Sequence, residues 1–170
     1  MIEIVEGNLL ESSCDILVQQ VNCQGHMNSG IAKQIRDKWY RVYKEYKETI
    51  EFLKLNGIVR DSFDLLGYIN WTKIDYFDKY IVNFFSQDQY LPRNICHTDY
   101  NAFKLCCEGL KNFIDTTYTA NQKANLYIGF PYKIGCGLAG GDWNIVYNII
   151  EEEFKDYNVR IYKYNETRNN

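Results

Sequence analysis

The chain has 170 residues, of which 46% are hydrophobic and 24% charged, and its formal net charge at pH 7 is -3. This length suits one domain that buries roughly two thirds of the surface of its unfolded chain. The few Lys and Arg residues form no cluster, which argues against a nucleic-acid backbone as the main partner, because such binding needs several basic contacts.

Targeting and metal signals are weak throughout the chain. The N-terminus lacks a basic region followed by an apolar stretch, and no run approaches the roughly 20 apolar residues of a membrane span, so we expect a cytoplasmic protein without membrane contact. The six cysteines form no regular framework and are interpreted as reduced thiols. Cys23-x-x-His26 and Cys96-His97 supply too few spaced ligands for zinc, and we expect neither a metal nor a cofactor.

The first half of the chain predicts two strands, one long helix and a hairpin. Residues 2–5 form a short apolar strand, and residues 16–21 form a nearly continuous apolar strand that is expected to be buried on both faces. Apolar residues then recur every three to four positions over residues 31–53, which predicts one long helix that ends near Gly57. Strand-like residues 63–71 and 80–85 predict a hairpin.

The second half alternates helices with strands. Residues 100–114 predict a helix, 126–130 a strand, 143–154 a helix and 159–164 a last strand. We therefore expect an α/β fold, a three-layer α/β/α arrangement formed by residues 1–164, with residues 165–170 as a loose tail. In such folds the ligand site lies beyond the carboxyl ends of central strands.

A glycine-rich loop, Pro131-Tyr-Lys-Ile-Gly-Cys-Gly-Leu-Ala-Gly-Gly-Asp-Trp143, follows one of these strands and precedes a helix. Glycines at positions 135, 137, 140 and 141 leave room for an anion to approach the backbone amides, and a helix N-terminus adds partial positive charge. Asp142 is placed where a helix N-cap belongs. The loop therefore predicts a phosphate site.

A second loop of the same kind, Asn22-Cys-Gln-Gly-His-Met-Asn-Ser-Gly-Ile-Ala32, also ends a strand and begins a helix. Two amide-rich loops at the strand ends predict one ligand with two phosphates.

Other interpretations of these segments are weaker. Residues 135–140 match the dinucleotide pattern G-x-G-x-x-G, but that pattern belongs to the first βαβ unit of its fold, whereas only one strand follows here. No Gly-Lys-Ser/Thr occurs, so a Walker A loop is excluded. Cys136 near a helix N-terminus could act as a nucleophile with His26 or His97 as its base, although a packing cysteine is the simpler interpretation. The tyrosines of residues 39–46 fit an exposed helix flank better than a base-stacking surface.

The two loops, together with Val5-Glu-Gly-Asn-Leu9, resemble the macrodomain family over nearly the whole chain. The likeness is greatest to the bacterial, phage and yeast-type branch, which includes ADP-ribose-1″-phosphate phosphatases, and to the terminal ADP-ribose glycohydrolases. It implies a mixed central sheet flanked by helices, with ADP-ribose in a cleft at the strand ends.

The resemblance also implies which residues contact the ligand. The first loop would hold the distal ribose and one phosphate, and the second loop would hold the diphosphate. The implied substrate-binding residues are Asn8, Leu9, Val21, Asn22, Met27, Asn28, Ser29, Gly30, Ile31, Ala32, Ser86, Gln87, Pro131, Ile134, Gly135, Cys136, Gly137, Leu138 and Ala139.

Four positions depart from the pattern of the family. Asn8 stands where members carry the aspartate that accepts the adenine amino group, so that hydrogen bond loses its charge assistance. Gln87 replaces the lysine that forms a covalent ribose adduct, and Ala139 replaces the assisting aspartate. Ala32 stands where another hydrolytic branch has an aspartate. Two family routes to cleavage are therefore missing.

His26 is the residue near the implied distal ribose that titrates close to neutral pH, and Asn22 could orient a ribose hydroxyl or a water, so these two are the candidate catalytic residues. We expect a monomer that binds ADP-ribose or ADP-ribose-1″-phosphate and hydrolyses a substituent of the distal ribose. ADP-ribosylated protein or nucleic-acid ends are further candidate partners. The alternative is a non-catalytic ADP-ribose-binding module.

Overall fold

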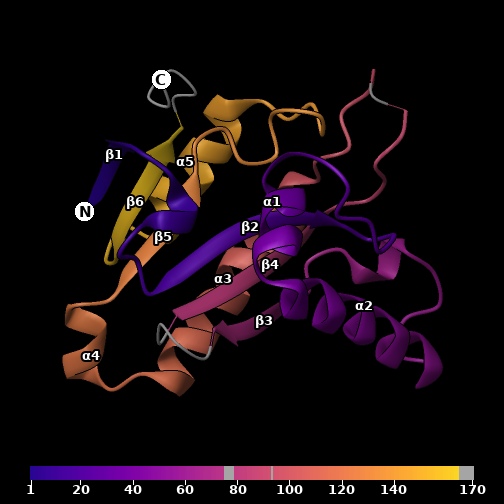
Figure 1. Ribbon diagram of the computed structural model, residues 1–170, viewed down its shortest axis with the longest axis horizontal. Coiled ribbons are helices and arrows are strands. Elements are labelled where there is room, and N and C mark those ends of the chain that lie inside the picture. Colours follow the sequence, from indigo (N-terminus) through magenta and orange to yellow (C-terminus); the bar gives the residue numbers. More distant parts are fainter. Residues whose placement is uncertain (75–78, 93, 165–170) are drawn as a thin grey trace.

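The computed structural model describes residues 1–74, 79–92 and 94–164. Six strands form one sheet in the order β1-β6-β5-β2-β4-β3 (Figure 1). Their bounds are β1 Ile2–Glu6, β2 Ile16–Asn22, β3 Ile69–Ile74, β4 Lys79–Gln87, β5 Tyr127–Pro131 and β6 Asn158–Lys163. All neighbouring strands are parallel except β3, which pairs antiparallel with β4 as the predicted hairpin requires, so the sheet is mixed.

The helices cover both faces of this sheet. They are α1 Gly30–Lys38, α2 Tyr40–Leu55, α3 Tyr100–Thr117, α4 Ala120–Ala124 and α5 Trp143–Glu153, with two 3-10 turns, η1 Leu9–Glu11 and η2 Phe63–Leu65. The buried residues of α1 and α2 pack in one core cluster and those of α3 and α5 in another. The predicted three-layer α/β/α class is therefore confirmed.

Strand β2 joins the two cores, as its apolar sequence predicted. Ile16 and Val18 pack in the cluster of α3 and α5, while Leu17 and Val21 pack in the cluster of α1 and α2. All four side chains are buried. Because β2 is central and held on both faces, the loop that follows it starts from a rigid position.

The prediction of one helix over residues 31–53 is wrong, because the chain forms two helices there. Trp39 has φ -136° and ψ 75°, which ends α1 before α2 begins at Tyr40. The Trp39 amide still donates to the Ile35 carbonyl at 2.7 Å. The apolar spacing is continuous across the break, and no Gly or Pro marks it, so periodicity cannot reveal it.

Several boundaries also differ from the prediction. Residues 63–65 form a 3-10 turn instead of a strand, because Asp61 Oδ1 accepts hydrogen bonds from the amides of Phe63 and Asp64. Strand β3 begins later, at Ile69, and extends beyond the predicted end. Helix α4 was not predicted, although Thr119 and Gln122 form a capping box at its start. The expected tail, residues 165–170, lies outside the described residues.

None of the helices in the described ranges combines the length and apolar character needed to cross a bilayer.

Candidate ligand-binding site

A cavity of about 440 Å³ lies at the carboxyl ends of β2, β4 and β5, whose last residues Asn22, Gln87 and Pro131 all line it. Both predicted loops contribute walls. The predicted residues that the structure brings together here are Val21, Asn22, His26, Asn28, Ser29, Gly30, Ile31, Ala32, Gln87, Pro131, Ile134, Gly135, Gly137, Leu138 and Ala139. Most of the predicted ligand-contact residues therefore meet in one cavity, at the strand ends that the α/β pattern favours, and their contact with a ligand stays a prediction.

Three predicted residues lie outside the lining because they serve the surrounding fold. Leu9 and Met27 are buried in the core of α1 and α2. The Ser86 hydroxyl is fully buried and donates to Gln20 Oε1 at 2.9 Å. These side chains support the cavity from behind, and direct contact with a ligand stays a prediction for them.

Asn8 and Cys136 also lie outside the lining. Asn8 caps η1, since its Oδ1 accepts from the Leu10 amide at 3.0 Å. The Cys136 thiol lies 3.3 Å from the Ile134 carbonyl oxygen, and burial raises the pKa of this thiol to about 11. Cys136 is thus a protonated thiol at neutral pH, which argues against the nucleophile interpretation.

The carboxamide of Asn22 organises the first loop. Its Oδ1 accepts from the amides of Gln24 and His26 at 3.0 and 3.2 Å, and its Nδ2 donates to the His26 carbonyl at 2.7 Å. The buried Tyr46 hydroxyl donates to the Asn22 carbonyl at 2.6 Å and accepts from the Gly25 amide at 3.0 Å. These bonds leave Asn22 little freedom to orient a substrate, so its observed role is to shape the loop.

The N-terminus of α1 opens onto the cavity. Ser29 is its N-cap but makes no side-chain cap hydrogen bond, and Ser29, Gly30, Ile31 and Ala32 all line the cavity. The first amides of a helix have no intrahelical acceptor, and the helix dipole adds partial positive charge at this end. Gly30 has φ +57° with no atom within 4 Å of an added Cβ. This end of α1 therefore presents free donors to an anion.

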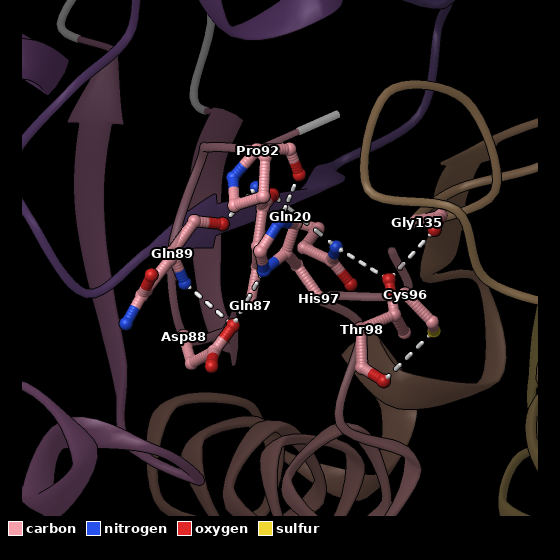
Figure 2. Close-up of polar contacts among 9 residues, drawn as sticks. All are labelled: Gln20, Gln87, Asp88, Gln89, Pro92, Cys96, His97, Thr98 and Gly135. Atoms are coloured by element: carbon pink, nitrogen blue, oxygen red, sulfur yellow. Dashed lines mark hydrogen bonds and ion pairs between the residues drawn. The ribbon is translucent and has the colours of Figure 1, made fainter. Parts of the chain in front are cut away.

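The second loop is held from below by a chain of side chains that starts on β2 (Figure 2). Gln20 Nε2 donates to Thr98 Oγ1 at 3.0 Å, and Thr98 Oγ1 donates to the Gly135 carbonyl at 2.6 Å. Gly135 has φ +73°, and a Cβ added there would lie 2.7 Å from Gln20 Oε1. Position 135 therefore requires glycine because of the loop's own packing.

The other glycines of this loop have different roles. A Cβ at Gly140 would lie 3.1 Å from the Ile95 carbonyl oxygen, and one at Gly141 would lie 2.7 Å from the Gly135 carbonyl oxygen. Only at Gly137 does an added Cβ meet no atom within 4 Å, and Gly137 lines the cavity. The expected open approach to the backbone is therefore found at Gly137, while the other three glycines serve packing.

Asp142 caps α5 as predicted. This cap means that the N-terminus of α5 is not the source of partial positive charge that the sequence suggested for an anion. The Asp142 side chain accepts from the Asn144 amide at 2.8 Å, so a carboxylate already occupies the N-terminus of α5. Asp142 is not among the residues that line the cavity. The helix end available to an anion is that of α1 instead of α5.

No protein-family model and no curated protein sequence matches the chain. Solved structures do match it. A protein of unknown function from Bacteroides thetaiotaomicron aligns with a TM-score of 0.77 at 21% identity, covering 95% of this chain and 97% of that one. The macrodomain of Mycobacterium tuberculosis DarG aligns with a TM-score of 0.73 at 23% identity, with the same coverage. The fold is that of a macrodomain. Thermosipho africanus DarTG, solved in complex with ADP-ribose, aligns with a TM-score of 0.70 at 19% identity, covering 99% of this chain and 43% of that one.

The cavity also contains residues that the sequence interpretation missed. These are Gln20, Tyr90, Leu91, Tyr132 and Lys133. Tyr90 and Leu91 follow β4, and the Tyr90 ring lies against the His26 ring with 4.4 Å between the ring centroids. The position of this segment directly after a central strand was the available signal.

Few charged side chains are found among the described residues that line the cavity. Of these residues, Lys133 and His26 can carry positive charge, and none is Asp or Glu. Arg36 of α1 donates from Nη1 to Asn28 Oδ1 at 2.8 Å, which fixes the end of the first loop. Within the described residues, no group of three or more His, Cys, Asp or Glu side chains could hold a metal ion. Backbone amides are therefore the main donors available to an anionic ligand.

Proposed function

We propose that the cavity binds ADP-ribose or a derivative such as ADP-ribose-1″-phosphate. One observation carries this proposal: the open N-terminus of α1 and the open backbone at Gly137 line the same cavity. Two groups of amide donors in one cavity suit a diphosphate, and a cavity of about 440 Å³ has the size of ordinary small-molecule sites. The ADP-ribose complex of Thermosipho africanus DarTG, which shares the fold, supports the choice of ligand.

The proposed orientation follows from the two loops. The first loop and the start of α1 hold the distal ribose and one phosphate, and the second loop holds the diphosphate at Gly137. Adenine lies toward Asn8, outside the cavity lining, with an amide oxygen in place of the family's carboxylate. We propose that the protein acts as a cytoplasmic monomer.

Hydrolysis of a distal-ribose substituent is the second candidate, and His26 favours it. His26 lines the same cavity as Asn28 and Gln87, and an imidazole can act as a general acid or base. Gln87 cannot form the covalent adduct of a lysine, and its Nε2 donates to the Gln89 carbonyl at 2.6 Å. A hydrolase of the phosphatase or glycohydrolase type would therefore have to use direct attack by water. Without activity, the protein is an ADP-ribose-binding module.

Two measurements test these proposals. Calorimetry should give a micromolar Kd for ADP-ribose, about -7 to -8 kcal/mol, and weaker binding of NAD and AMP. Equal affinity for the three ligands would contradict the site model. Incubation with ADP-ribose-1″-phosphate, O-acetyl-ADP-ribose and ADP-ribosylated protein or DNA, followed by detection of free ADP-ribose, separates a hydrolase from a binding module.

A further inference from the structure

His97 is a buried histidine with hydrogen bonds at both ring nitrogens (Figure 2). Nδ1 lies 3.2 Å from Asp88 Oδ1, and Nε2 lies 2.5 Å from the Pro92 carbonyl oxygen. The side chain is only 2% exposed. Water therefore cannot replace either partner without a local rearrangement.

Both partners of His97 are hydrogen-bond acceptors. A carbonyl oxygen can only accept, and Asp88 Oδ1 also accepts from the Gln89 amide at 2.6 Å, so it is not the protonated oxygen of a carboxylic acid. A neutral imidazole has one N–H, and either tautomer would direct a lone pair at an acceptor. Only the imidazolium form satisfies both contacts, and the Asp88 carboxylate stabilises its charge.

These two bonds hold the ends of one short segment. Asp88 and Pro92 enclose Tyr90 and Leu91, which line the cavity, and Tyr90 packs on His26. The His97 amide also donates to the Ala139 carbonyl of the second loop at 2.8 Å. His97 thus connects two walls of the cavity.

We propose that His97, in its imidazolium form, is a positioning residue that clamps residues 88–92 and thereby fixes the cavity wall beside His26. Its consequence for ADP-ribose rests on the proposed function, whereas the clamp itself does not.

Other titratable or charged groups lie near the pair. Asp99 lies two residues along the chain and Cys96 precedes His97. Cys23, whose amide donates to the Asp88 carbonyl at 3.3 Å, stays a neutral thiol because burial raises its pKa to about 12. Lys54 of α2 is close enough to Cys23 to lower the pKa of this thiol, whereas Asp88 and Asp99 raise it. Of these groups, the Asp88 carboxylate is the one in direct contact with the His97 ring, 3.2 Å from Nδ1.

The direction of the pH effect follows from the clamp. A ligand that needs residues 88–92 in place binds the protonated form better. Because the His97 ring is expected to be protonated at neutral pH, the affinity for ADP-ribose should fall above neutral pH, as His97 loses its proton. Deprotonation removes one charge-assisted bond, so the Kd for ADP-ribose should rise about tenfold across that range.

Nitrogen-15 NMR of the imidazole rings tests the clamp in the free protein. The sequence has only two histidines, so His97→Gln and His26→Gln variants assign both rings. We expect His97 to be protonated at both nitrogens at neutral pH, and the Tyr90 ring signals to shift when His97 loses a proton. A neutral His97 ring at neutral pH, or Tyr90 signals that do not respond, would overturn the proposal.

Calorimetry with ADP-ribose across the same pH range tests the consequence. The 1″-phosphate is avoided, because a phosphomonoester itself titrates near about pH 6. His97→Gln and Asp88→Asn should bind more weakly at low pH and lose the pH dependence. Asp115→Asn, which removes the same charge at the end of α3, should match the wild type. His26 also lines the cavity, so the decisive comparison is made in a His26→Gln background: a pH dependence that His97→Gln does not remove there would overturn the clamp's role. If ADP-ribose binds at no pH, the proposed function fails and the NMR result alone decides the clamp.

Discussion

The two glycines Gly135 and Gly137 allow the site model to be tested by a matched pair of substitutions. Gly137 has an ordinary backbone conformation and open space for a Cβ, so Gly137→Val should fold with the free energy of unfolding changed by no more than about 1 kcal/mol. Its side chain would project into the cavity at the proposed diphosphate position. Losing one charge-assisted hydrogen bond to a phosphate costs about 1.5–3 kcal/mol, so the Kd for ADP-ribose should rise at least about tenfold.

Gly135→Ala should produce the opposite pattern. A left-handed conformation costs a residue with a Cβ roughly 1–2 kcal/mol. Gln20 would also have to move away from the added atom and give up bonds to Thr98 and Ser86, worth about 1 kcal/mol each. The total of about 3–4 kcal/mol corresponds to a Tm lower by roughly 6–16 °C in a protein of this length.

Calorimetry with ADP-ribose and thermal unfolding of both variants test these two predictions. An unchanged Kd in folded Gly137→Val would place the diphosphate elsewhere, and an unchanged Tm in Gly135→Ala would refute the packing assigned to the second loop.

Four further predictions concern individual side chains. Asn22→Ala should lower the free energy of unfolding by about 2–4 kcal/mol, because it removes three hydrogen bonds to the loop backbone and leaves two part-buried loop amides without acceptors; a Tm equal to that of the wild type would contradict the organising role. If the protein is a hydrolase, His26→Ala should lower kcat more than it raises the Kd, and full activity would remove His26 from the mechanism. Borohydride should trap no ADP-ribosyl adduct on a lysine, since Gln87 occupies the family's lysine position; mass spectrometry would reveal one. Asp142→Ala should lower the free energy of unfolding by about 1 kcal/mol through loss of the α5 cap, without changing the Kd for ADP-ribose.

The sequence predicted the layers and the cavity because those depend on local pattern. Alternation of apolar strands with amphipathic helices determines the class, and glycine-rich loops after β2 and β5 mark the carboxyl edge. The break at Trp39 could not be predicted, because the apolar spacing on both sides of it is that of one continuous helix. The segment that carries Tyr90 and Leu91 was missed for a related reason: its conformation depends on His97, a contact between residues that no local pattern connects.

The structure changed the roles expected for single side chains more than it changed the expected fold. A side chain's hydrogen-bond partners depend on the tertiary structure, which the sequence pattern does not reveal. Asn22 matched a ribose contact by family position, yet its carboxamide is bound to the loop that carries it. Asp142 marked the start of α5 correctly, but the same carboxylate occupies the helix end that seemed ready for phosphate.

Recognition at this cavity consequently depends on backbone geometry more than on charged side chains. Among the described lining residues, Lys133 alone has a permanent positive charge, so the proposed diphosphate would be neutralised mainly by amides at Gly137 and at the start of α1. Amide donors act only when the backbone is held in place. The side chains that support the two loops, Tyr46 under the first and Gln20 with Thr98 under the second, should therefore matter as much for the proposed binding as the loop residues themselves.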